Sequence, residues 1–187
     1  MVVKSSKKQK KIWFNIIAPK EFGNQTIGET TAFGPQQLIG RNIRVSLMNL
    51  LRDPKKQNMQ LTFKIKEVRD KNAITELIKY ELVSGFIKRL ARKGRNKIGD
   101  SFVAETKDKI KVKIKPIMIT RSKTQKSKLT MLKKTAKEFI IERVKTQNLT
   151  ELTNDIISTK TQREIKGKLK KIHPLTVCEF KAIIKMR

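Results

Sequence analysis

Short segments in which apolar and polar residues alternate run through the first half of the chain and recur near its end. In the clearest segment, 59–66, every second residue is apolar, which predicts a strand with one buried face. The alternation slips at Glu67-Val68, which predicts a β-bulge. A polar turn at 69–72 leads into 73–80, so these segments are predicted to form an antiparallel hairpin. Further strands are predicted at 12–17, which we expect to be buried, and at 43–47, 101–106, 109–115 and 175–186.

Apolar residues repeat at helical spacing in four other segments, which are 82–91, 129–144, 149–157 and 161–172. Gly94 suits the position that closes the first helix, and Thr161-x-x-Glu164 resembles a capping box that opens the last one. The glycine-rich region 20–40 is expected to be a loop or short irregular elements. Pro116 is expected to interrupt the strand ladder, and residues 117–119 are expected to continue as extended chain. The order of elements predicts an α+β fold with a largely antiparallel, barrel-like β core and packed helices.

The charge of the chain narrows the choice of partner. The 187 residues include 45 Lys and Arg against 16 Asp and Glu, so the net charge is +29. A net charge of about 2–8 is enough to keep a small domain soluble. A larger excess destabilises the folded chain through self-repulsion unless a polyanion neutralises it. Nucleic acid is therefore the favoured partner, ahead of an anionic membrane surface or an acidic protein.

The basic residues are clustered, which points to particular contact surfaces. Residues 1–11 hold five lysines and no acid, residues 86–97 hold six bases and no acid, and residues 107–137 hold twelve bases against Asp108 alone. Lys outnumbers Arg 34 to 11, which favours contact with the phosphate backbone over base reading. The candidate RNA-binding residues are Lys7, Lys8, Lys10, Lys11, Lys88, Arg89, Arg92, Lys93, Arg95, Lys97, Arg121, Lys123, Lys126 and Lys128.

The same clusters suggest how the chain is organised. Residues 1–11 are predicted to be a flexible basic N-terminal arm that orders on nucleic acid. Residues 12–187 are predicted to form a single α+β RNA-binding domain. Four lysines at 109, 111, 113 and 115 line one face of a strand, so that face must be exposed or bound to an anion. Neither a signal peptide nor an apolar run near the ~20 residues of a membrane span is visible.

Catalytic and metal-binding signals are weak. The chain has one histidine and one cysteine, which excludes an internal disulfide framework and a cysteine-based zinc site, and fits a reducing compartment such as the cytosol. A nucleophile pair of Cys178 and His173 is conceivable, although no third group that would orient it is suggested. No phosphate-binding loop, dinucleotide fingerprint or metalloprotease motif occurs. We therefore expect no enzyme activity, no cofactor and no metal.

An ordered set of short motifs resembles a known family, the archaeal and eukaryotic small-subunit ribosomal proteins called S-one-e or S-three-a-e. The resemblance runs from about Ile12 to the C-terminus. The motifs that carry it are Ile12-Trp13-Phe14, Ala18-Pro19, Ile27-Gly28-Glu29-Thr30, Leu38-Ile39-Gly40-Arg41, Val45-Ser46-Leu47, Leu61-Thr62-Phe63-Lys64-Ile65, Tyr80-Glu81-Leu82, Thr106-Lys107-Asp108 and Ile172-His173-Pro174-Leu175.

The resemblance implies a β-barrel-like core with helices, bound to small-subunit ribosomal RNA on the platform near the messenger RNA exit. It implies a structural, non-enzymatic role in translation, in the cytoplasm and within the ribosome. The implied partners are ribosomal RNA, neighbouring small-subunit proteins and messenger RNA near its exit. Residues 88–97 match the family's Arg-rich helix, and residues 121–128 match its basic loop. Lys109 stands where the family usually has glycine, so that turn can differ.

Two other functions remain open from the sequence. The first is a free RNA-binding or RNA-chaperone protein without a fixed place in a ribosome. The second is a cationic protein peripheral to membranes, which needs an amphipathic helix with an exposed apolar face. The helix at 129–144 could serve that purpose, but its apolar face is more simply explained as part of the core, so we expect no membrane partner.

Overall fold

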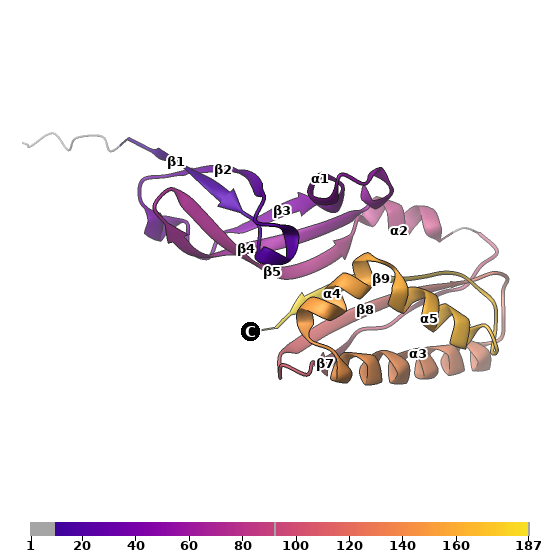
Figure 1. The fold of residues 1–187 in the computed structure, drawn as a ribbon. Helices are drawn as coiled ribbons and strands as arrows, with labels where there is room; N and C mark the ends of the chain where they lie inside the picture. The colour runs from indigo at the N-terminus through magenta and orange to yellow at the C-terminus, as the bar shows by residue number, and fades with distance from the viewer. Residues whose placement is uncertain (1–9, 92, 187) are drawn as a thin grey trace, which may run out of the picture.

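Nine strands and five α-helices form over residues 10–91 and 93–186, which are the residues that the computed structural model describes. The strands are β1 (Ile12–Ile17), β2 (Thr26–Ala32), β3 (Asn42–Ser46), β4 (Met59–Arg69), β5 (Asn72–Leu82), β6 (Lys97–Gly99), β7 (Phe102–Glu105), β8 (Lys111–Thr120) and β9 (Leu175–Lys185). The α-helices are α1 (Leu47–Leu51), α2 (Ser84–Leu90), α3 (Lys126–Thr146), α4 (Leu149–Ile157) and α5 (Lys160–Leu169). In Figure 1, α3, α4 and α5 lie together over the C-terminal strands.

The sheet branches at β5. Along one edge, β5 pairs antiparallel with β4, and β4 pairs with β3. Along its other edge, residues 72–74 pair in parallel with β1, and residues 79–81 pair antiparallel with β9. The far edge of β9 pairs with β8, which also carries β6 and β7. One hydrogen-bonded sheet therefore connects the N-terminal strands to the strands beneath the helices.

The predicted α+β class is confirmed, and so is the largely antiparallel sheet. Among the described strands, the pairing of β1 with β5 is the one parallel pair. The sheet does not close into the expected barrel-like core, because its path ends at β2 on one side and at β6 on the other. Both β1 and β9 pair along one edge of β5, β1 with residues 72–74 and β9 with residues 79–81.

Three details of the strands correct the sequence analysis. The first strand buries Phe14 but leaves Trp13 63% exposed, so β1 has one buried face rather than two. The region 20–40, expected to be a loop or short irregular elements, contains the regular strand β2, which pairs along β1. The strand expected to end at residue 115 continues through Pro116 to Thr120 as β8. The pairing of β8 with β9 shifts register at this proline, so the ladder accommodates its missing N–H group.

The predicted helices are confirmed, with two corrections at their ends. The first, α2, ends at Leu90, and Gly94 lies further along, in the following loop, with a φ of 86° that favours glycine. The predicted capping box at 161–164 is wrong, because α5 already begins at residue 160. A capping box instead opens α4, where the backbone N–H of Asn148 donates to Glu151 Oε2 at 3.1 Å.

The longest helix, α3, covers the sheet with one apolar face. Its buried residues repeat every four positions, which aligns them along the helix. They share a core with buried residues of β8 such as Val112 and Ile114. The apolar face predicted for residues 129–144 is therefore part of the core, and its buried members are Leu132, Ala136, Ile140 and Val144.

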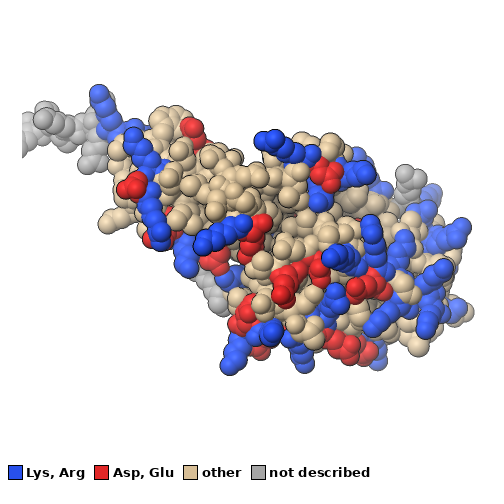
Figure 2. All heavy atoms as spheres, in the orientation of Figure 1, with Lys and Arg blue, Asp and Glu red and all other residues tan. Residues whose placement is uncertain are grey.

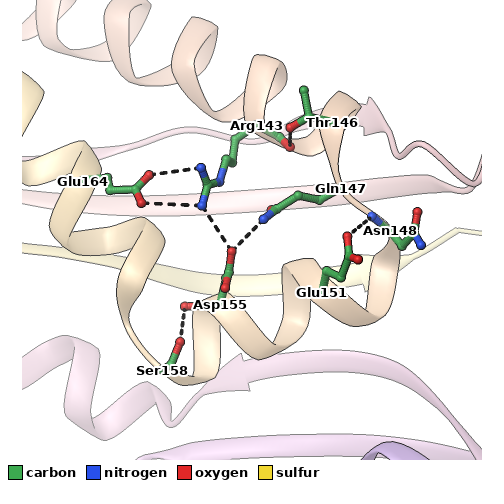
Figure 3. Close-up of polar contacts among 8 residues, drawn as sticks. All are labelled: Arg143, Thr146, Gln147, Asn148, Glu151, Asp155, Ser158 and Glu164. Carbon is green, nitrogen blue, oxygen red and sulfur yellow. Dashed lines mark hydrogen bonds and ion pairs between the residues drawn. The ribbon is translucent and has the colours of Figure 1, made fainter.

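Arg143 joins the three helices of this layer. Its guanidinium lies 3.3 Å from Asp155 Oδ2 of α4 and 3.4 Å from Glu164 Oε2 of α5 (Figure 3). Gln147 Nε2 donates to the same oxygen of Asp155 at 2.6 Å. Because Arg143 and Asp155 are only partly exposed, solvent screens this pair less than a surface pair. The contacts therefore link α3 to both shorter helices.

Glu179 of β9 is a half-buried carboxyl beside α5. Burial raises the pKa of Glu179 above its ordinary value, and a hydrogen bond from Gln162 Nε2 at 3.3 Å offsets part of that rise. A raised pKa means that the folded state favours the protonated carboxyl more than the unfolded state does. The ionised side chain therefore lowers stability at neutral pH, and this penalty disappears as the pH falls below the ordinary pKa.

Replacing Arg143 by alanine is expected to lower the free energy of unfolding by about 1–2 kcal/mol, because Asp155 loses a charged partner in a partly desolvated position. Urea unfolding followed by circular dichroism measures this change. Arg163→Ala is the matched control, since Arg163 is exposed on α5, and its effect should stay within about 0.5 kcal/mol. Equal losses in the two variants would show that Arg143 has no special role.

Replacing Glu179 by glutamine is expected to raise the unfolding midpoint at pH 7, because glutamine has no charge to desolvate. The difference from the parent chain should shrink as the pH falls to about 4, where the unfolded-state glutamate becomes protonated. Thermal melts of both chains across this pH range test the expectation. Glu138→Gln on α3, an exposed position, reports the effect of removing one negative charge alone. A Glu179→Gln chain that is less stable at pH 7 would contradict this assignment.

Candidate nucleic-acid interface

Asn96 holds two basic loops together. Its backbone N–H donates to Thr120 Oγ1 at 2.9 Å, and its carbonyl accepts from the Thr120 N–H at 3.0 Å. Its side-chain oxygen Oδ1 accepts from the Thr124 N–H at 2.9 Å. The loop that follows α2 is thereby attached to the loop that precedes α3. These two loops are the ones that the sequence analysis identified as separate basic clusters.

A third segment joins the same end of the molecule. The backbone N–H of Arg121 donates to the carbonyl of Pro174 at 3.0 Å, which places the segment 170–174 beside the other two loops. Figure 1 shows these connections together at the end of the sheet opposite β1, and Figure 2 shows lysine and arginine side chains crowded there. We call this surface the basic end, and it consists of Lys93, Arg95, Lys97, Arg121, Lys123, Lys126, Lys128, Lys170 and Lys171.

The basic end has an uncompensated positive charge. Residues 82–99, 109–137 and 165–178 contain no Asp or Glu. Within the described part of the chain, none of the nine cations forms an ion pair. Lys126 and Lys128 also occupy the first turn of α3, which carries no acid, and the helix dipole disfavours cations there. An anionic ligand would relieve both the mutual repulsion and the unfavourable dipole contact.

Seven of the fourteen predicted RNA-binding residues lie in the basic end. Lys170 and Lys171 were missed because they sit outside the runs chosen from the sequence. The absence of acids between 165 and 178 is the signal that could have found them. The seven predicted residues that the structure gathers are Lys93, Arg95, Lys97, Arg121, Lys123, Lys126 and Lys128.

The two described bases of α2 belong to a different surface. Arg89 donates to Asn58 Oδ1 at 3.4 Å and lies over the ring of Phe86, with 6.0 Å between the guanidinium carbon and the ring centroid. Lys88 is exposed, and Ile87 of the same helix is buried. Arg89 is therefore tied to the loop before β4 rather than to the basic end. Arg92 lies outside the described residues.

The N-terminal candidates are at the opposite end of the molecule. Lys10 and Lys11 are exposed just before β1, and Lys11 Nζ lies 5.5 Å from the centroid of the Phe33 ring. Figure 1 places the start of β1 far from the loops of the basic end. The structure thus separates these two lysines from the seven gathered residues. Lys7 and Lys8, with most of the predicted arm, lie outside the described residues.

Other chemistry has little support in the part of the chain that is described. No group of three or more His, Cys, Asp or Glu side chains in residues 10–91 and 93–186 is placed to hold a metal ion. Burial raises the pKa of the Cys178 thiol to about 12, so the thiol stays protonated at neutral pH. Over the same residues, none of the helices has the length and apolar character needed to cross a membrane.

Comparisons with known proteins agree with the motifs in the sequence. The model of the Ribosomal S3Ae family matches residues 3–186. A protein of Methanothermobacter thermautotrophicus named small ribosomal subunit protein eS1 is 31% identical over 185 residues, which cover 99% of this chain and 93% of the relative.

Two further archaeal proteins carry the same name. The one from Haloarcula marismortui is 30% identical over 177 residues, covering 95% of this chain and 83% of the relative. The one from Nanoarchaeum equitans is 31% identical over 166 residues, covering 89% of this chain and 84% of the relative. Because the family model spans nearly the whole chain and these relatives match along most of it, the chain belongs to the Ribosomal S3Ae family.

Proposed function

We propose that this protein is a structural constituent of the small ribosomal subunit and binds ribosomal RNA through the basic end. The observation that carries the proposal is the gathering of nine cations without a neutralising acid. They lie in three loops and at the ends of the elements beside them, and the hydrogen bonds of Asn96 and Arg121 bring these loops together. The names of its archaeal relatives support the ribosomal role. The protein acts without catalysis in this proposal, because its task is to hold folded RNA.

The composition of the basic end indicates how RNA would be recognised. Seven of its nine cations are lysines, which meet phosphates as point charges and do not read base edges in pairs. The loop segments of the basic end, 93–97, 121–125 and 170–174, contain no Phe, Tyr or Trp, so they offer none of these rings for base stacking. Both features suit the shape and phosphate contacts by which proteins recognise folded RNA. We therefore expect little sequence preference and a strong dependence of affinity on salt.

The position of the protein on the small ribosomal subunit is also part of the proposal. We place the protein in the cytoplasm, on the platform of the small subunit near the messenger RNA exit, beside neighbouring small-subunit proteins. The family resemblance supports this placement. Residues 12–187 would act as one RNA-binding domain, and residues 1–11 as a basic arm. A free RNA-binding or chaperone protein is the alternative, and co-sedimentation with small subunits in high salt separates the two, since a free factor would dissociate.

Replacing Lys123, Lys126 and Lys128 together by glutamine is expected to weaken binding to small-subunit RNA. If each lysine neutralises one phosphate, the slope of log affinity against log salt should fall by about 2–2.7 in magnitude. Filter binding across a salt series measures the slope. The control carries the same charge change at Lys134, Lys145 and Lys160, which are exposed on the helical layer. Equal slopes in the two variants would mean that general charge, and not the basic end, determines binding.

Asn96→Ala is expected to weaken RNA binding although the net charge does not change, because the two loops lose the contact between Asn96 Oδ1 and the Thr124 N–H. The free energy of unfolding should fall by about 1 kcal/mol, as for one lost hydrogen bond. RNA affinity and urea unfolding are measured on the same protein. Asn58→Ala is the control, because its side chain contacts Arg89, away from the basic end. An RNA affinity for Asn96→Ala equal to that of Asn58→Ala would argue against this positioning role.

A further inference from the structure

The face of the sheet opposite the helical layer has a row of lysines. In β8, Lys111, Lys113 and Lys115 alternate with Val112 and Ile114, which are buried in the core shared with α3. Successive side chains of a strand point to opposite faces of its sheet. These lysines therefore project away from α3. The sequence analysis found that this strand face must be exposed or bound to an anion, and the RNA contact at the basic end does not use it.

A β-bulge adds a lysine from the neighbouring strand. Lys115 pairs with Ala182, whereas the next residue, Pro116, pairs with Phe180, so Lys181 is the extra residue of β9 at this register shift. Two hollows on the surface, of about 410 Å³ and 490 Å³, are both lined by Lys115 and Lys181. The register shift at Pro116 of β8 therefore lies at the place where Lys115 and Lys181 come together.

The two hollows form what we call the open-face trough. The first is also lined by Arg44 and Lys79, near the start of α2, and the second by Lys97, which belongs to the basic end. The trough therefore extends from β3 and β5, past Lys115 and Lys181, to the proposed RNA-binding surface. Its cations, in that order, are Arg44, Lys79, Lys115, Lys181 and Lys97.

The acids of the trough already have partners. Glu81 forms ion pairs with Arg44, at 3.3 Å, and with Lys79. Asp100 pairs with Lys133 of the helical layer at 3.2 Å. Within the described residues, Lys97, Lys115 and Lys181 have no ion pair. The middle and one end of the trough thus keep a positive charge that the folded chain does not neutralise.

We propose that the open-face trough binds a stretch of RNA backbone, as a second contact that is continuous with the basic end through Lys97. This inference rests on the proposed function, because it takes RNA as the ligand. The chemistry of the trough favours RNA over an acidic protein. Lysine is depleted at the centres of protein–protein interfaces, whereas aromatic residues are enriched there, and none of the described residues that line either hollow is aromatic. Point charges without aromatic surface suit phosphates.

The test combines two changes, Lys115→Gln and Lys181→Gln, in the full chain. The affinity of this double variant for folded small-subunit RNA is measured across a salt series. Its salt slope is compared with the salt slope of the variant with glutamine at positions 123, 126 and 128. Loss of two phosphate contacts should lower the magnitude of the salt slope by about 1.4–1.8, and the effects of the two variants should add when they are combined. The control has the same change of charge at two exposed positions of α3, Lys134→Gln with Lys145→Gln. A variant that keeps the positive charge, Lys115→Arg with Lys181→Arg, should have the same salt slope as the parent chain.

The outcomes of this experiment distinguish failure of the trough proposal from failure of the proposed function. A slope equal to that of the control would overturn the trough proposal, while a lowered slope in the basic-end variant would still support the proposed function. If neither variant lowers the slope, the proposed function fails as well. If the trough variant keeps its RNA affinity but loses binding to a polyglutamate peptide, the trough is a site for an acidic protein and the RNA assignment is wrong. Circular dichroism melts confirm that every variant is folded.

Discussion

The pairing of β9 with both β5 and β8 is the interaction on which the rest of the structure depends. Residues 182–184 have β8 along one edge and β5 along the other, so the last strand joins the early hairpin to the strands that carry the helices. Tyr80 and Ile183 are partners across this joint, and both are buried. Such distant pairing pays a large loop-closure entropy, which the burial of these side chains offsets. The helical layer and the basic end both rest on strands that β9 holds in place.

Charge is the second constraint, because a net charge of +29 acts against a compact chain. Several Asp and Glu side chains form ion pairs with cations that lie between helices or between strands. Asp155 and Glu164 pair with Arg143 between the helices, and Glu81 pairs with both Arg44 and Lys79 on the sheet. The basic end has no acids of its own, and the middle of the trough keeps lysines without ion pairs. The surfaces that remain positive are therefore the ones that a polyanion can occupy, and RNA would supply the missing stabilisation.

The two surfaces proposed to bind RNA depend on hydrogen-bond and strand geometry more than on further charged residues. Asn96 joins two loops through its hydrogen bonds to Thr120 and Thr124, and a register shift at Pro116 adds Lys181 to the row that ends at Lys115. Neither contact involves a charged group. Both nevertheless determine where the cations lie, and the density of positive charge on a surface depends on that placement. This explains why an asparagine and a proline matter in a protein whose function we assign to lysines.

The sequence by itself determined the α+β class, most of the elements and the acid-free clusters, because alternation, helical period and charge are local properties that a single segment displays. The β4–β5 hairpin, with its bulge after Ile65, and the long helix α3 follow this rule. Only the tertiary structure decided that the sheet stays open, that β2 and β6 form, and that seven of the fourteen candidate cations share one surface with Lys170 and Lys171. A short strand such as β6 is stabilised by a partner strand that is distant in the chain. The three loops meet through hydrogen bonds between residues that are 24 or more positions apart. A local sequence pattern encodes neither kind of contact.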